Sequence, residues 1–113
     1  MEEIRSKENP LVKEMVKLAG SARFRRETGR FLLEGARLAG DAVQSGFRPL
    51  CALATQEALD KYPQARHVLE AAGRAVLIPG AVAEKISGTA VSQGVFCVCP
   101  IPAQELELRR EGR

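Results

Sequence analysis

The chain has 113 residues, which is enough for one domain with an ordinary hydrophobic core. Its hydrophobic content of 45% and charged content of 27% are typical of a globular protein, and a net charge of +3 is compatible with a nucleic-acid partner. No run approaches the roughly 18 apolar residues of a membrane span, and the acidic start Met1-Glu2-Glu3 is unlike a signal peptide, so we expect no membrane partner.

The first predicted helix begins at Asn9-Pro10 and ends at Gly20. Asn can accept hydrogen bonds from the free amides of a first turn, and Pro fits the first helical position. Leu11, Met15 and Leu18 recur on one face at helical spacing. The polar, basic segment 21–29 is predicted to form a short helical turn followed by a loop.

Short apolar runs and helical segments then alternate along the chain. The predicted strands cover residues 30–33, 50–54, 75–78 and 95–99. The predicted helices cover residues 35–45, 56–61, 63–72 and 81–86, and the first of these is expected to turn Leu38, Ala39, Ala42 and Val43 inward. This alternation indicates crossover connections and an α/β fold with a parallel or mixed sheet. The last strand is apolar on both sides, so helices should cover both faces of the sheet.

The composition changes after Pro100-Ile101-Pro102. The residues that follow are polar and charged and have no core-forming face. We therefore expect one domain over residues 1–100 and, over residues 101–113, a linker toward a further domain.

Residues that could carry catalysis are scarce. His67 stands among charged neighbours and is expected on the surface. The three cysteines, an odd number in apolar surroundings, indicate reduced thiols and a cytoplasmic protein. Cys97 and Cys99 should lie side by side on one face of a strand as small buried hydrophobes, because no further Cys or His cluster completes a metal site.

Two glycine-containing segments could be ligand loops. The segment 88–94 lacks the ending of a phosphate-binding P-loop and leads into a strand, so it is either a simple connection or a loop that contacts a ligand through backbone amides and Gln93. Gly35 opens a helix after a strand, but the adjacent Glu34 would repel phosphate and is interpreted as structural, capping amides or pairing with an arginine.

The most informative segment is the basic one near the amino end. It holds six basic residues and only two acids, Glu14 and Glu27, and so exceeds the +3 charge of the whole chain. The basic residues are Lys13, Lys17, Arg23, Arg25, Arg26 and Arg30. Guanidinium forks match phosphate geometry, which favours a polyanion-binding surface over a merely solvated helix face and loop. Phe24 within the segment could stack on a base or anchor the segment in the core.

Three segments in a fixed order resemble a known family. They are Ser6-Lys7-Glu8-Asn9-Pro10-Leu11-Val12-Lys13, the R-x-R-R-x-x-G-x-F-L-L-E-G run from Arg23 to Gly35, and Gln93-Gly94-Val95 at the last strand. Together they resemble the N-terminal substrate-binding domain of the SpoU family of RNA 2′-O-ribose methyltransferases, over about residues 4–99.

The resemblance implies a three-layer α/β/α sandwich with a small mixed sheet, similar to kink-turn-binding ribosomal proteins. It also implies that the domain holds structured RNA, usually ribosomal RNA, for a separate catalytic domain that binds S-adenosylmethionine and forms a homodimer. None of the family's catalytic motifs is found in this sequence, so we assign no catalytic, cofactor or metal residue and expect no methylation by this chain alone.

The leading hypothesis is therefore an RNA substrate-binding domain. Its RNA contacts would be the six basic residues named above, with Lys7, Asn9 and Gln93 as further candidates. A stand-alone RNA-binding protein of the kink-turn-binder type is the alternative, and a protein–protein module with an acidic partner is a third interpretation.

Overall fold

The computed structural model describes residues 1–102. They form a five-stranded sheet with the strand order β1-β4-β3-β5-β2. The strands are β1 (Glu2–Glu3), β2 (Arg30–Glu34), β3 (Cys51–Ala54), β4 (Ala75–Leu77) and β5 (Val95–Pro100). Strand β4 pairs in parallel with β1 and β3, whereas β5 is antiparallel to both β3 and β2. The sheet is therefore mixed, and β2, β3 and β4 all point in one direction.

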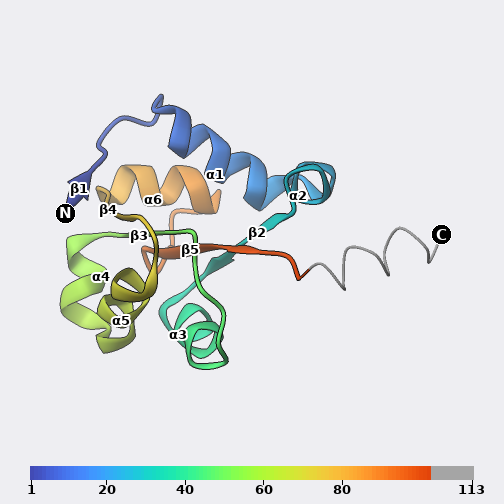
Figure 1. Cartoon of the computed structure of the whole chain (residues 1–113). Coiled ribbons are helices and arrows are strands. Elements are labelled where there is room, and N and C mark those ends of the chain that lie inside the picture. The colour runs from blue at the N-terminus through green and yellow to red at the C-terminus, as the bar shows by residue number, and fades with distance from the viewer. Residues whose placement is uncertain (103–113) are drawn as a thin grey trace.

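Helices cover both faces of this sheet (Figure 1). One face carries α1 (Pro10–Gly20), α2 (Ala22–Thr28) and α6 (Gly80–Ser87). The other carries α3 (Ala36–Gln44), α4 (Gln56–Lys61) and α5 (Pro63–Ala71). This arrangement confirms the expected α/β class and the three-layer α/β/α sandwich.

Strand β5 separates the two halves of the core. Phe96 and Val98 point into the cluster under α1 and α6, whereas Val95, Cys97 and Cys99 point into the cluster under α3 and α5. These five side chains are at most 1% exposed. The two-faced apolar pattern of this strand therefore correctly predicted helices on both sides of the sheet.

The amino-terminal helices begin and end at residues suited to those positions. The Asn9 side chain accepts a hydrogen bond from Leu11 N (2.9 Å), and Pro10 occupies the first turn of α1. Ser21 then ends α1 and begins α2, because its amide donates to Lys17 O and its hydroxyl accepts from Phe24 N (3.1 Å). Gly29, at φ 67°, ends α2 in the left-handed conformation.

The sequence analysis was wrong about part of this region. The predicted turn and loop at residues 21–29 form instead a continuous seven-residue helix, α2. Strand β1 was missed, because two exposed glutamates carry no apolar pattern. Leu38 was expected inside but is 53% exposed, since α3 packs through the small residues Ala36 and Ala39. The remaining elements agree with the predicted bounds to within one residue at each end.

In the described part of the chain, no helix has the length and apolarity needed to cross a membrane. Pro100 ends β5, and Ile101 N donates a hydrogen bond to Gly29 O (2.8 Å), which holds Ile101 beside the end of α2. The predicted linker, from residue 103 onward, lies outside the described residues.

Candidate nucleic-acid interface

The basic segment lies at one edge of the sheet. Helix α2 leads into β2, whose first residue, Arg30, pairs with Pro100 at the end of β5. The chain therefore leaves β5 next to α2, as Figure 1 shows. Residues from the end of α1, from α2 and from the start of β2 are close neighbours here, so the fold brings together Lys17 and the four arginines of the segment.

Two of those arginines have partners within the fold. Arg25 donates from Nη1 to the carbonyls of Leu18 (2.6 Å) and Ala19 (3.3 Å), which lie in the last turn of α1. Those carbonyls have no partner within their own helix, so Arg25 stabilises the corner between α1 and α2. Arg30 donates to Glu14 at 2.7 Å, and both side chains are less than a third exposed. Neither guanidinium is presented freely, and their RNA contact stays a prediction.

Lys13, Lys17, Arg23 and Arg26 are exposed. Arg23 pairs with Glu27 (3.0 Å) and Lys13 with Glu8 (3.4 Å), but all four of these side chains are more than half exposed. Such surface pairs contribute about 0–1 kcal/mol and give way easily to a phosphate. Within residues 1–102 no carboxylate lies in ion-pair distance of Lys17 or Arg26. We call these four residues the basic surface.

Phe24 anchors this surface. Its half-buried ring packs against the core under α1 and α6, and Lys17 Nζ lies 5.6 Å from the ring centroid. A cation above an aromatic face is attracted to it, which positions Lys17. The arrangement favours the core-anchor interpretation of Phe24 over a stacking platform.

Of the other predicted contacts, Lys7 and Asn9 lie at the start of α1 near Lys13, whereas Gln93 lies away from the basic surface. Gln93 is at the opposite end of the strands, where its side-chain oxygen accepts a hydrogen bond from Ala36 N (2.8 Å). Because Gly35 offers no side chain, Gln93 caps α3 in its place. Lys7 is exposed before α1, and Asn9 caps α1. The structure thus gives Gln93 and Asn9 structural contacts and does not test whether they contact RNA.

Glu34 is structural, as expected, but with a different partner. It accepts a hydrogen bond from Ser92 Oγ (3.2 Å), and Ser92 Oγ accepts from Gly94 N (3.0 Å). This contact and the Gln93 cap fasten the segment 88–94 to the end of β2 and the start of α3. Gly94 has φ 74°, and a Cβ there would lie 2.6 Å from Thr55 Oγ1, so the close approach requires glycine.

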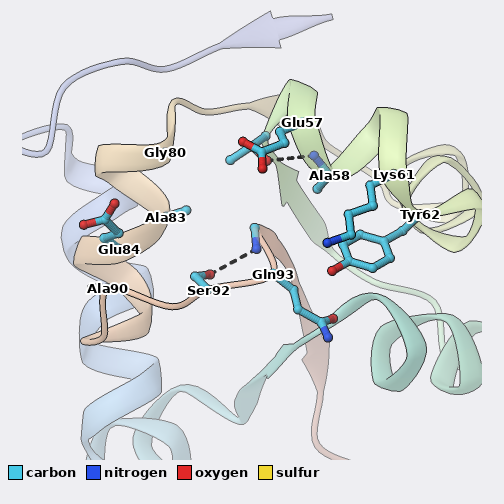
Figure 2. Close-up of a pocket in the computed structure, with 12 residues that line it drawn as sticks. Glu57, Ala58, Lys61, Tyr62, Gly80, Ala83, Glu84, Ala90, Ser92 and Gln93 are labelled. Carbon is cyan, nitrogen blue, oxygen red and sulfur yellow. Dashed lines mark hydrogen bonds between the residues drawn. The ribbon is translucent and has the colours of Figure 1, made fainter.

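A pocket that the sequence did not predict opens at this same end of the strands (Figure 2). Its volume is about 230 Å³. We call it the strand-end pocket, and its polar wall includes Thr55, Glu57, Lys61, Tyr62, Ser92 and Gln93. In the sequence only Gln93, as a candidate contact of a ligand loop, pointed toward this pocket, because the remaining residues come from elements far apart in the chain.

The cysteines do not form a reactive site. All three are free and buried, and the Sγ atoms of Cys97 and Cys99 are 4.0 Å apart on one face of β5. Burial raises the pKa of Cys51 to about 11, and contact with Cys99 together with burial raises the pKa of Cys97. The Cys51 and Cys97 thiols therefore stay neutral, and all three side chains pack as small hydrophobes, as predicted. Residues 1–102 contain no cluster of three metal-ligating side chains, and His67 is exposed.

Solved structures similar to this chain include RNA methyltransferases. The chain is similar to an RNA 2′-O ribose methyltransferase (TM-score 0.76, 29% identity), with 90% of this chain and 38% of that chain covered. It is also similar to an rRNA methyltransferase from Sinorhizobium meliloti (TM-score 0.71, 25% identity, 88% and 36% covered). The SpoU methyltransferase AviRb from Streptomyces viridochromogenes, solved with AdoMet, shares the fold at 23% identity (TM-score 0.63, 88% and 36% covered).

This chain therefore spans little more than a third of the length of these enzymes. No curated protein sequence matches it. The family model described as the MRM3-like substrate binding domain matches residues 9–97, which include the basic surface, the caps of α1 and α3 and most of the sheet. The chain belongs to the MRM3-like substrate-binding domains, the substrate-binding module of SpoU-type RNA 2′-O-ribose methyltransferases.

Proposed function

We propose that this domain binds structured RNA, with ribosomal RNA as the substrate class, and positions it for 2′-O-ribose methylation by a catalytic domain elsewhere in the parent protein. The family assignment supports RNA as the ligand. The single observation that carries the mode of binding is the basic surface on α1 and α2. Its exposed cations can neutralise phosphates, while Arg25 and Arg30 hold the helices that present them.

The position of the basic surface supports the presentation of bound RNA to a second domain. The chain leaves β5 beside Gly29 at the end of α2, so RNA held on the basic surface lies next to Ile101, where the chain leaves the sheet. The solved relatives are more than twice as long as this chain, and one of them was solved with AdoMet. S-adenosylmethionine is accordingly the cofactor that we propose for the parent protein, which we expect to be a homodimer. The buried free thiols fit a reducing compartment such as the cytoplasm.

Charge removal on the basic surface tests this proposal. The variant Lys17→Ala/Arg23→Ala/Arg26→Ala should weaken binding to ribosomal RNA fragments, because three phosphate contacts are lost. The slope of log affinity against log salt should become shallower by about 2, at roughly 0.7 per contact. The measurement is a salt-titrated RNA-binding assay.

The matched control is Arg37→Ala/Arg48→Ala/Arg66→Ala, which removes equal charge from exposed positions outside α1 and α2. It should keep the salt slope of the wild-type domain. Equal losses in the two triple variants would show that the contacts are not at the basic surface. No affinity in the wild-type domain, together with a salt-sensitive complex with an acidic protein, would favour the protein–protein interpretation.

A further inference from the structure

The strand-end pocket lies where the topology of the sheet changes. Strands β3 and β4 are parallel neighbours, but β3 leads into α4 on one face and β4 leads into α6 on the other. Because the two connections diverge to opposite faces of the sheet, a crevice opens between the starts of these helices. In open α/β sheets such a crevice at the carboxyl ends of the strands is the usual place for a ligand.

The third wall of the pocket is the segment 88–94. It is fastened by the Ser92–Glu34 hydrogen bond and by the Gln93 cap of α3, and Thr55 N donates to Gly94 O (3.0 Å). The pocket is therefore a built cavity with anchored walls. Figure 2 shows Glu57 and Lys61 of α4 and the following Tyr62 on one side of the pocket, and Ser92 and Gln93 on the other side.

The size of the pocket limits its ligand. About 230 Å³ is below the 300–1,000 Å³ of sites that enclose drug-sized ligands and whole cofactors. It is suited to one planar ring system with its immediate substituents. A concave, polar cavity of this size also does not match a protein docking surface, which is flatter and larger.

The charges of the wall argue against phosphate. Glu57 and Glu84 contribute two carboxylates, and Lys61 contributes one ammonium. This wall repels an anion but accepts hydrogen bonds from N–H groups. The N1–H and N2–H₂ donors at the edge of guanine are adjacent, which matches the two oxygens of one carboxylate.

The pocket also holds an aromatic ring that can meet a ligand. Phe96 is fully buried, Phe31 and Phe47 pack edge to face with each other, and Phe24 packs against the core beneath Lys17. Tyr62 lines the pocket, and Lys61 Nζ lies 5.4 Å from its ring centroid. Such an exposed cation–π contact is weaker than the stacking of a base on an aromatic ring.

We infer that the strand-end pocket binds a single unstacked nucleobase of RNA, stacked on Tyr62, with guanine preferred through Glu57. The choice of an RNA base as ligand rests on the proposed RNA-binding function. The site itself is separate from the basic surface and lies at the other end of the strands. A strand of six residues such as β5 spans roughly 20 Å, so one RNA can reach both sites only if several nucleotides lie between them.

Tyr62 allows a direct test, because it is the one tyrosine in the sequence. In protein with ring-¹³C-labelled tyrosine, titration with GMP should move the Tyr62 ring signals upfield and saturably, since a stacked purine shields the ring. UMP should bind about tenfold more weakly, because it lacks the adjacent pair of donors. Ribose 5-phosphate should leave the signals unchanged.

The exposed carboxylates give a matched pair of variants. Glu57→Gln should weaken GMP binding about tenfold and leave UMP binding unchanged. Glu70→Gln removes the same charge from α5, outside the wall of the pocket, and should change neither. Both positions are exposed, so neither variant is expected to disturb the core.

The outcomes separate this inference from the proposed function. Tyr62 signals that stay unmoved with both GMP and UMP at millimolar concentration, or equal shifts with GMP and ribose 5-phosphate, would overturn it even if RNA binds the basic surface. A saturable GMP response in a domain without measurable affinity for ribosomal RNA would support the pocket and remove the support for ribosomal RNA as substrate.

Discussion

Neighbouring arginines of one short helix have different environments in this domain. Arg25 reaches back to two carbonyls at the end of α1, whereas Arg26, the next residue, is exposed. From the sequence they look equivalent, since both belong to the same basic run. The direction of each side chain from α2 decides which of them stabilises the fold and which can meet a ligand.

This difference can be measured with two single substitutions. Arg25→Ala should lower the free energy of unfolding by about 1–3 kcal/mol, because a charged donor to one part-buried and one exposed carbonyl is lost. Arg26→Ala should change it by no more than about 0.5 kcal/mol. Urea denaturation of the two variants provides the comparison, and equal stabilities would contradict the role assigned to Arg25.

At the scale of elements, the edge strand β1 depends on one ion pair. It has two residues and pairs only with β4. Arg74 donates to both carboxylate oxygens of Glu2, at 2.8 and 2.7 Å. These hydrogen bonds hold the pKa of Glu2 below its usual value. A bidentate pair of this kind fixes the position of the strand more than it adds free energy, since both side chains are solvated.

The lowered pKa predicts how this contact responds to pH. The contribution of Glu2 is fully present above its unfolded pKa of about 4.5 and is lost as the pH falls through the lower folded value. Glu2→Gln should therefore be slightly less stable than wild type at pH 7. The two proteins should be equally stable once the Glu2 carboxyl of the wild type is protonated. Thermal unfolding from pH 7 to pH 2 tests this, with Glu3→Gln as the control. A difference that persisted at pH 2 would exclude the ion pair as its cause.

At the scale of the whole molecule, the two ends of the strands have different chemistry. The end at the start of β2 carries the basic surface and the point where the chain leaves β5. The other end, after β3 and β4, carries the strand-end pocket, with carboxylates in its wall. One end is suited to phosphate, and the other is suited to a neutral ring with N–H donors.

The proposed division between RNA binding by this domain and methyl transfer by another domain leads to a prediction about chain length. The 113-residue chain should bind RNA but incorporate no methyl groups from labelled S-adenosylmethionine, whereas the product of a reading frame that continues past Arg113 should incorporate them. A stop codon after Arg113 would favour the stand-alone RNA-binding alternative. Methyl incorporation by the 113-residue chain alone would contradict the division of roles.

Much of the fold was predictable because its signals are local. Asn9-Pro10, Ser21 and Gly29 act on their immediate neighbours, and the two-faced apolar strand at residues 95–99 requires cover on both sides wherever it lies. The errors arose where local signals are weak. Residues 21–29 are too polar to show a core-facing stripe, and β1 is formed by pairing with a strand more than seventy residues away.

The candidate sites divide in the same way. Composition alone located the basic segment, because electrostatic character depends on which residues are present and survives almost any arrangement of them. Only the tertiary structure decided which arginines face solvent and which glutamine caps α3. It also decided that Glu57, Tyr62 and Ser92 share one pocket. These properties depend on distances between segments far apart in the chain, and only the packing of helices against the sheet sets those distances.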